Sequence, residues 1–376
     1  MKGLYLSKKL TAILTGGFVL SLSILLCVGK KREFSEQENR YLSSFPKFSW
    51  EALKEGDFTA DLESYLSDHF PFRDFFMGVK TGVELCLGRQ EINGIYIAED
   101  GYLIEKYKQP QNTEKIIRSF RGLKEATEQA EVYLMLVPTA SCVYADKLPE
   151  GAPINSQLDT ISQIYEEAGC VSIPIEEALL SLRDEKEPLY YRTDHHWTSY
   201  GAYIAYLEFC KVRGFEPVRL ESLEKKVVTE EFKGTIYSKV NDYLRDGDAI
   251  SIYVDPKEKL TVSYTDTKEQ TDSLYAEEYL DKKDKYSYFL NNIHPLIEIT
   301  NETIDTEEEL VLIKDSYANC MVPFLIKHYK KIYVIDPRFY KEAASELINQ
   351  NPKVKDVLLL YNMNTLDTDL GVGGIY

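Results

Sequence analysis

The 376-residue sequence is poor in the residues that build metal centres and disulfide frameworks. It contains five histidines and six cysteines, and no CxxC pair or other ligand spacing relates them. Cys27 lies in a long apolar run, which leaves five cysteines, so at least one is unpaired. We expect these five to be isolated small residues of the core, and we expect no cofactor. The five are Cys86, Cys142, Cys170, Cys210 and Cys320.

Basic residues are also scarce relative to acidic ones. The chain has 44 Lys and Arg against 61 Asp and Glu, a net charge of −17. The first 32 residues hold six basic groups and no acidic ones, so residues 33–376 carry a net charge of −23. This excess argues against nucleic acid and against any polyanion bound by general electrostatics. It leaves neutral sugars open as ligands.

Charge is absent altogether from Leu10 to Gly29, a run long enough to cross a bilayer as a helix. Three lysines precede the run and favour a cytoplasmic N-terminus, although three basic residues also follow it. A cleavable signal peptide is the alternative. The run is long for one, and no small-x-small site closes it. We therefore predict a cytoplasmic tail (1–9), a single-pass membrane anchor (10–29) and an extracellular remainder.

The rest of the chain reads as a lead-in segment followed by one α/β domain. Residues 33–80 mix short helical patterns with turns, and from 81 to 376 buried strands alternate with helical segments, which indicates a mostly parallel sheet. Residues 92–105 (INGIYIAEDGYLIE) read as a hairpin around a Glu-Asp-Gly turn. The alternation lapses at about 215–300, where we expect an insertion of short strands and loops near the rim of the site. The expected sheet strands are VYLMLVP (132–138), VSIPI (171–175), ELVLIK (309–314), KKIYVIDPRFY (330–340) and VKDVLLLYNMN (354–364).

Ser316 in VLIKDSYAN sits where an apolar strand ends and a helix begins. In a parallel sheet such strand ends form the floor of a site. Backbone N–H groups of the following helix can hold a developing oxyanion there, which makes this a position for a nucleophile. A helix N-cap is the alternative role.

The stretch RTDHHWTSYGAY (192–203) supplies the groups that a serine nucleophile needs. Asp194 and His196, spaced as D-x-H before a helix, can act as orienting carboxylate and base. His195 would point the other way, because consecutive side chains diverge in extended backbone. Two alternatives stay open: a structural turn, and a metal site built on Asp194, His195 and His196.

These stretches together resemble the SGNH hydrolases, with their blocks in rotated order. LVLIKDSYAN resembles the first block, IYVIDPRFY occupies the place of the second and DVLLLYNMN that of the third. VYLMLVP looks like the fourth strand, and DHHWTSYGAY looks like the terminal Asp-His block. This circularly permuted order resembles the DHHW protein family and the SGNH-like domains of alginate O-acetyltransferases. The resemblance spans about residues 34–376 and is sharpest in ENRYLSSFP, SDHFPFRD, TDHHWT, KDSYAN and PFLIKHYKKIYVIDPRFY.

The resemblance implies a three-layer α/β sandwich and a triad of Ser316, His196 and Asp194. It also implies an oxyanion hole that includes the Ser316 N–H and an asparagine, for which Asn362 and Asn364 compete. The second and third blocks lack the glycines of the family pattern.

Two further residues are candidates for contact with substrate. Arg338 follows the second block and could hold a substrate or brace its loop through a salt bridge. Trp197 is expected to pack under the His loop, with stacking on a sugar ring as the alternative.

The function that the resemblance implies is transfer of an acetyl group to a cell-surface polysaccharide through an acyl-serine. A membrane-bound O-acyltransferase would supply the acetyl group across the membrane. An esterase would use the same triad with water as acceptor. A surface polysaccharide assembly or binding protein without turnover is the third possibility.

Overall fold

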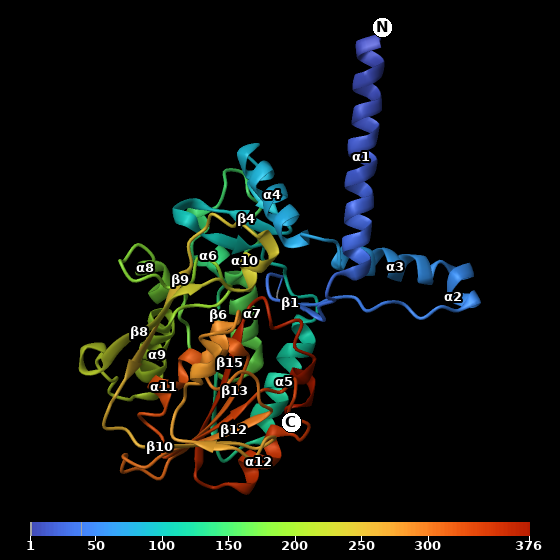
Figure 1. Cartoon of the computed structure of the whole chain (residues 1–376). Coiled ribbons are helices and arrows are strands. Elements are labelled where there is room, and N and C mark those ends of the chain that lie inside the picture. The colour runs from blue at the N-terminus through green and yellow to red at the C-terminus, as the bar shows by residue number, and fades with distance from the viewer. Residues whose placement is uncertain (1, 39) are drawn as a thin grey trace. The chain divides into compact units, whose positions relative to one another are not determined.

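The computed structural model describes residues 2–38 and 40–376, so Met1 of the expected tail and Asn39 of ENRYLSSFP lie outside the described residues (Figure 1). Contacts divide the chain into two units. The N-terminal unit runs to Arg89 and includes Ser238–Leu244. The α/β unit comprises Gln90–Tyr237 and Arg245–Tyr376.

The N-terminal unit begins with α1 (Lys2–Val28), so the helix starts inside the stretch expected as a tail. Its part from Lys8 to Val28 is long and apolar enough to cross a membrane, and none of it is buried. The elements that follow are β1 (Phe34–Ser35), β2 (Arg40–Tyr41), α2 (Trp50–Glu55), α3 (Asp57–Asp68), α4 (Arg73–Cys86) and the end of α10 (Thr235–Val240).

An ion pair joins the stretches ENRYLSSFP and SDHFPFRD. The Arg40 guanidinium donates to both carboxylate oxygens of Asp68, at 3.0 and 2.5 Å, and the Ser43 N–H donates to Asp68 at 2.8 Å. The hydrogen bond from Arg40 holds the pKa of Asp68 well below its usual range, against the effect of burial. The His69 ring Nε2 bonds the Ser43 carbonyl at 3.0 Å, which gives this histidine a structural role.

An eight-stranded sheet forms the centre of the α/β unit (Figure 1). Five neighbouring strands, from β14 to β7, are parallel, and the three on the other side of β14 are antiparallel. In sheet order the strands are β11 (Gln270–Thr271), β10 (Leu260–Tyr264), β12 (Leu296–Asn301), β14 (Lys331–Ile335), β13 (Glu309–Lys314), β15 (Val354–Asn362), β6 (Glu131–Val137) and β7 (Val171–Ser172).

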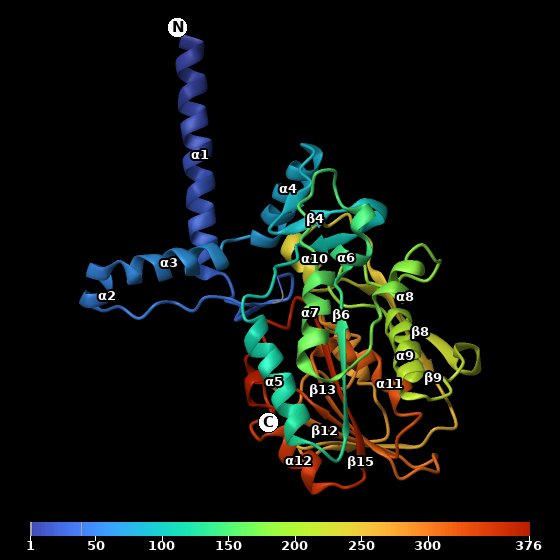
Figure 2. The same cartoon turned by 180° about the vertical axis from the view of Figure 1, so that it is seen from behind.

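Helices cover both faces of this sheet, which confirms the three-layer sandwich. Successive residues of β6, such as Leu134 and Met135, pack into different hydrophobic clusters because side chains alternate along a strand. Figures 1 and 2 place α5 and α12 on one side of the strands and α9 on the other. One cluster includes α5 (Thr113–Ala126), α7 (Leu158–Ala168) and α12 (Ala344–Gln350); the other includes α6 (Ala140–Val143), α8 (Glu176–Ser181), α9 (Ser199–Arg213) and α11 (Val322–Leu325).

The strand order places Ser316 at a switch point. After β13 the chain forms β14 on one side of β13 and then β15 on the other. In open α/β sheets, ligands bind outside the carboxyl ends of the strands where the order reverses in this way. Ser316 lies at that edge of the sheet, where only Asp315 separates it from the end of β13.

The stretch expected as an insertion of short strands and loops has two parts. Its first part forms a separate hairpin of β8 (Glu224–Phe232) and β9 (Asp248–Val254). Its second part supplies β10, β11 and most of β12, which extend the main sheet with antiparallel strands. Periodicity could not show this extension, because these strands are short and several of their residues are half exposed.

Two smaller expectations can be compared with the structure. The hairpin around Glu-Asp-Gly is confirmed, because β4 (Ile95–Ile97) and β5 (Leu103–Glu105) pair antiparallel across Glu99–Gly101, and β3 (Glu91–Ile92) adds a third strand through the tight turn Asn93-Gly94, where both φ angles are positive. All six cysteines are free, but only Cys210 and Cys320 are buried. Cys86 is exposed rather than in the core.

Candidate active site

A short, tightly closed loop presents the Asp-His pair. Tyr190 and Trp197 form an antiparallel bridge that brings the ends of the loop together. Thr198 then caps α9, its hydroxyl accepting from the Gly201 N–H at 3.1 Å. A Cβ on Gly201 would lie 2.3 Å from the Leu189 carbonyl oxygen, so only glycine fits where the helix leaves the loop.

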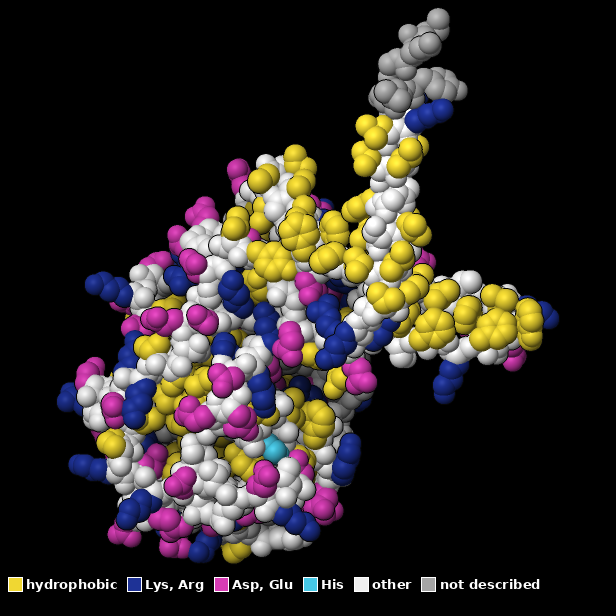
Figure 3. Space-filling view, in the orientation of Figure 1, with side chains coloured by type: hydrophobic (Ala, Val, Ile, Leu, Met, Phe, Trp, Pro, Cys, Tyr) yellow, Lys and Arg dark blue, Asp and Glu magenta, His cyan; other side chains and the backbone are white. Residues whose placement is uncertain are grey.

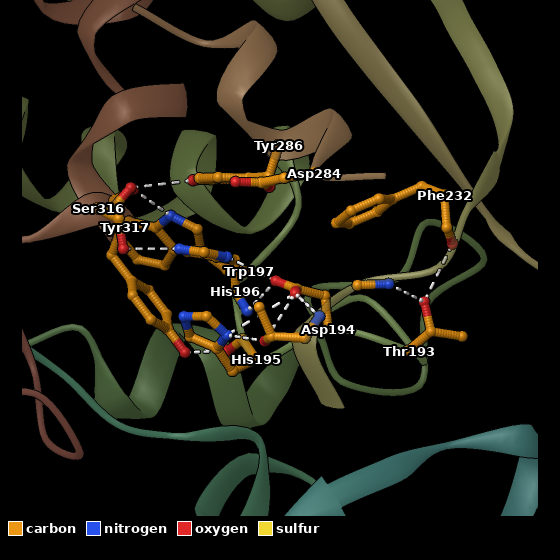
Figure 4. A network of polar contacts seen from close by, with 12 residues as sticks. Thr193, Asp194, His195, His196, Trp197, Phe232, Asp284, Tyr286, Ser316 and Tyr317 are labelled. Carbon is orange, nitrogen blue, oxygen red and sulfur yellow. Dashed lines mark hydrogen bonds and ion pairs between the residues drawn. The ribbon is translucent and has the colours of Figure 1, made fainter. Parts of the chain in front are cut away.

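The three side chains predicted as a triad form one hydrogen-bonded chain with His196 in the middle (Figure 4). Asp194 Oδ1 is 2.5 Å from His196 Nδ1, and His196 Nε2 is 2.7 Å from Ser316 Oγ. A carboxylate can only accept, so Nδ1 carries the proton and Nε2 is free to accept from the Ser316 hydroxyl. Asp194 and His196 are buried and Ser316 is half-buried, so the chain of bonds leads outward to the serine.

The Asp194 carboxylate is fixed by the segment that follows β8. Its Oδ2 accepts from the N–H and the hydroxyl of Thr235, at 2.8 and 3.1 Å, and its Oδ1 also accepts from the His196 N–H at 3.0 Å. A Cβ on Gly234 would lie 2.2 Å from Asp194 Oδ2, so the backbone passes where a side chain would displace the carboxylate. The orientation of the acid is therefore set by several bonds, not by His196 alone.

A second buried carboxylate fixes the base of the same loop. Asp248, at the start of β9, accepts from the N–H groups of Arg192 and Thr193 at 3.0 and 2.8 Å, and from the Thr193 hydroxyl at 2.6 Å. Burial raises the pKa of Asp248.

Burial and charge set the protonation states of the pair. Burial lowers the pKa of His196 to about 4, helped by the charge of His195 and opposed by Asp194. Burial acts in the other direction on Asp194, but the neighbouring histidines outweigh it and hold its pKa below the usual range. At neutral pH the pair is an imidazole and a carboxylate, the state in which His196 can accept a proton.

An aromatic ring covers one face of the His196 imidazole. The Tyr286 ring stacks on it with centroids 3.7 Å apart and planes 9° from parallel. The Tyr286 hydroxyl donates to the Ser316 carbonyl at 3.1 Å, so one side chain touches both the base and the serine. Tyr286 lies in the 3-10 helix Lys285–Tyr288, and no pattern in the sequence marked it.

His195 does not point away from His196, and this expectation is wrong. Its ring lies beside that of His196, with centroids 3.9 Å apart, and its Nδ1 is 2.6 Å from the Thr235 hydroxyl oxygen. The physical reason is that the segment is bent rather than extended, so adjacent side chains do not alternate. His196 is thus held between His195 and Tyr286.

Ser316 is held by a buried turn at the end of β13. Asp315 caps the 3-10 helix Ser316–Cys320: its carboxylate accepts from the N–H groups of Tyr317 at 2.9 Å and Asn362 at 2.7 Å. Burial raises the pKa of Asp315, against these bonds. Ser316 is the first residue of the helix, and a first-turn N–H has no acceptor within its own helix.

Trp197 packs beneath the loop and is fully buried. Its indole N–H donates to the Tyr317 carbonyl at 2.7 Å, and the Tyr317 hydroxyl returns a bond to the His195 carbonyl. The packing role matches the structure, and the alternative of stacking on a sugar is wrong because no face of the ring reaches solvent.

The other predicted residues lie at the same edge of the sheet but are engaged with their own neighbours. Arg338 forms a two-pronged ion pair with buried Asp336, at 2.9 and 2.6 Å. The Asn362 amide donates to the Val137 carbonyl at 3.1 Å and accepts from the Asn364 N–H at 2.9 Å. Asn364 is half-buried. The oxyanion role of either asparagine and the substrate role of Arg338 stay predictions.

Among the described residues, Asp194, His195 and His196 are near enough to share a metal ion, with ligand atoms within 4.8 Å of one another. Their lone pairs and protons are already committed, however. Both oxygens of Asp194 accept from His196 or Thr235, and His196 Nε2 faces Ser316. An ion would have to displace these bonds, so the donor set suits proton transfer better than coordination.

Comparison with known proteins finds matches to parts of the chain. A family model described as DHHW protein matches residues 116–335, more than half of the sequence. Two curated relatives are each named "Probable alginate O-acetylase AlgJ". The protein from Pseudomonas putida is 22% identical over 174 residues and that from Pseudomonas syringae pv. tomato 24% over 177 residues. Each match covers 44% of this chain and 45% of the relative, so the chain spans about half the length of these relatives.

Solved structures show the same fold. The crystal structure of a DHHW family protein from Eubacterium siraeum has a TM-score of 0.66 at 26% identity, covering 75% of this chain and 95% of that one. The structure of Bacillus cereus PatB1 with a sulfonyl adduct has a TM-score of 0.59 at 19% identity, covering 72% and 95%.

Proposed function

Because this chain belongs to the DHHW protein family, we propose that it is an extracytoplasmic O-acetyltransferase that modifies a cell-surface polysaccharide through an acyl-serine. The observation that carries the proposal is the continuous hydrogen-bonded chain Asp194–His196–Ser316. The name alginate O-acetylase, borne by two relatives, supports the reaction class.

In the first half-reaction, Ser316 Oγ attacks the carbonyl carbon of the acetyl donor while His196 Nε2 takes the hydroxyl proton. A C–O bond forms and the carbonyl oxygen becomes an oxyanion, for which the Ser316 N–H is a donor. Asp194 stabilises the imidazolium that results. Collapse breaks the bond to the leaving group, which takes the proton from His196, and Ser316 is left acetylated.

In the second half-reaction, a sugar hydroxyl replaces the leaving group. His196 removes its proton, the alkoxide attacks the acetyl carbon, and the Ser316–acetyl bond breaks as the serine recovers the proton. If water replaced the sugar hydroxyl as the acceptor, the same two half-reactions would make the protein an esterase. The two outcomes share every residue of the triad and differ in how well the site holds a sugar and excludes water.

The long apolar helix α1 supports a location for the proposed reaction. We propose that α1 is a single-pass anchor in the cell membrane and that the α/β unit is extracellular. A membrane-bound O-acyltransferase that delivers acetyl groups across the membrane is the proposed partner, because an anchored serine would receive the group where it emerges.

The experiment uses the full chain in detergent with 4-nitrophenyl acetate, with and without a neutral oligosaccharide. Wild type is compared with Ser316→Ala and with Ser181→Ala, an exposed serine at the end of α8. We expect wild type and Ser181→Ala to release nitrophenol equally and Ser316→Ala to release none above background.

The products separate the two acceptors. Acetyl recovered on the oligosaccharide supports transfer, and free acetate alone in the presence of acceptor supports an esterase. Equal release by wild type and Ser316→Ala would remove the basis for both and leave a binding role.

A further inference from the structure

Exposed large apolar side chains are concentrated in the N-terminal unit. Among the described residues, thirteen lie between Tyr41 and Leu87, whereas the much longer α/β unit exposes seven. Figure 3 shows them in yellow over α4 and over α2–α3. Soluble surfaces scatter such residues, and contiguous patches mark an interaction site.

The patch on α4 is a stripe along one face of the helix. Phe75, Val79, Val83 and Leu87 recur every four residues and are 62%, 47%, 53% and 81% exposed. Side chains at this spacing lie above one another on a helix. The helix is therefore amphipathic with its apolar side facing outward.

The patch on α2 and α3 is aromatic. Trp50 and Phe58 each lie edge-on against Phe48, with ring centroids 5.3 Å apart, and Phe45 packs in the same way on Tyr65. Trp50 and Phe45 are 71% and 63% exposed. Trp and Tyr, whose rings combine an apolar body with a polar group, are enriched at the boundary between lipid and water, and Trp50 and Tyr65 are of this kind.

Charge distinguishes this part of the chain from the rest. Residues 30–89 hold nine basic and eleven acidic groups, whereas residues 90–376 hold 32 basic and 50 acidic ones. The nearly balanced segment meets little repulsion at an anionic lipid surface, and the acidic remainder would be repelled.

An ion pair connects the segment after α1 to the helix α4 that carries one of the patches. Arg32 lies four residues beyond that helix, and its guanidinium pairs with Asp74 in the first turn of α4 at 3.0 Å. The Lys30–Arg32 cluster immediately follows the apolar run. The end of the membrane helix and the start of α4 are thus held together within one unit.

From these observations we infer that the apolar faces of α2, α3 and α4 lie in the interfacial layer of the bilayer that α1 spans, against phospholipid headgroups and the first acyl carbons. The inference rests on the anchoring role proposed for α1. Amphipathic helices bind in this way when an apolar face and aromatic rings coincide. The segment that leads to the catalytic unit would then be a membrane-bound platform rather than a free tether.

The two tryptophans of the chain make the test direct. Trp50 lies on α2 and Trp197 is fully buried in the α/β unit, and there are no others. The full chain is reconstituted in vesicles of phosphatidylcholine and phosphatidylglycerol whose acyl chains are brominated near the headgroup or unbrominated. We expect bromine to quench the emission that Trp50→Phe removes and to leave the remaining Trp197 emission unchanged.

Probes at other sites extend the test in the Trp50→Phe background. Phe75→Trp reports on α4, and Val212→Trp, near the C-terminal end of α9, is the matched exposed control. We expect quenching of the first and none of the second. Equal emission of the Trp50 and Phe75→Trp probes in both lipids, with the chain still resistant to alkaline extraction, would overturn the inference.

Two other results are distinguishable from that one. If the chain is extracted at alkaline pH, the anchor itself has failed and the proposed topology falls with it. If the probes are unquenched in pure lipid but shielded from aqueous acrylamide in native membrane vesicles, a membrane protein covers the face and the lipid inference is wrong.

Discussion

Two histidines of the α/β unit, buried His196 and half-buried His328, have similarly lowered pKa values, and only one of them is arranged for chemistry. Burial lowers the pKa of His196 to about 4, and it does the same for His328 in the turn that follows α11. By this measure alone the two imidazoles are equivalent. Both are neutral at physiological pH and both could accept a proton.

Their partners separate them. His328 Nε2 is 2.7 Å from the Tyr206 hydroxyl oxygen, and the ring stacks on Phe215 at 4.5 Å with planes 2° apart. No carboxylate among the described residues bonds it, whereas His196 lies between Asp194 and Ser316. A lowered pKa therefore reports burial, and the bonds on the two ring nitrogens decide what a buried histidine can do.

The largest expected effect comes from removing either end of the proton-transfer pair. Ser316→Ala should abolish acylation, and His196→Ala should lower its rate by about 10⁴-fold or more, since these groups act as a unit. His328→Ala should leave the rate within a few-fold of wild type. Single-turnover acylation by 4-nitrophenyl acetate measures all three. A comparable loss in His328→Ala would erase the distinction between the two regions.

Asp194→Asn should be nearly as severe, with acylation about 10³- to 10⁴-fold slower. The amide would favour the wrong tautomer of His196 and could not stabilise the imidazolium. Asp284→Asn is the matched control, because this nearby carboxylate acts on His196 through charge without a direct bond. Similar losses in both variants would mean that the electrostatic field of the nearby carboxylates, and not the hydrogen bond to Asp194, activates His196.

Replacing the stacked ring should have a smaller effect that depends on shape. Tyr286→Leu removes the face against His196 and should slow acylation about tenfold, equivalent to about 1.4 kcal/mol. Tyr286→Phe keeps the stack and loses only the hydroxyl, with its bonds to the Ser316 carbonyl and to Cys320 Sγ, so it should slow the reaction less. Equal effects of the two variants would assign the role to the hydroxyl instead of the ring.

Folding stability, unlike the acylation rate, should fall clearly in the His328 variant. His328→Ala removes the stack on Phe215 and leaves the Tyr206 hydroxyl without its imidazole acceptor, at a cost of about 2–3 kcal/mol. Thermal unfolding should show a lower Tm for this variant while acylation at 25 °C is retained. An unchanged Tm would mean that the imidazole contributes no packing.

The smallest effect is a displaced pH dependence. The pKa of His196 is about 4 in the folded chain against an ordinary 6.5, so its base form persists as the pH falls and acylation should decline near pH 4 rather than near 6.5. Stability follows the same sign: the neutral imidazoles favour folding above 6.5, and that contribution is lost as the pH falls toward 4. An acylation rate that halves near pH 6.5 would show that the pKa of His196 is not lowered in the folded chain.

The sequence was sufficient to predict the parts of the site that lie in local patterns. The D-x-H spacing and the strand-to-turn position of Ser316 predicted three side chains that the fold brings together across 120 residues. The buried strands were predicted because β-branched and other apolar runs between turns mark a sheet covered on both faces.

The supports of the site could not be predicted in this way. Thr235, Asp248 and Tyr286 all come from the stretch interpreted as an excursion, and their places depend on how that stretch packs against the sheet and the His loop. No periodicity encodes such contacts. His195 was misplaced for a related reason, since its direction follows from a bend whose shape is set by the bonds to Asp248.

Peptide mapping of the acylated protein tests whether Ser316 is the nucleophile that His196 activates. The full chain is mixed with 4-nitrophenyl acetate, quenched in acid and digested, and the acetylated residue is located by mass spectrometry. We expect one acetyl group on Ser316 in wild type and in His328→Ala, and none on Ser316 in His196→Ala. Acetyl found elsewhere, or on Ser316 to the same extent in His196→Ala, would contradict this expectation.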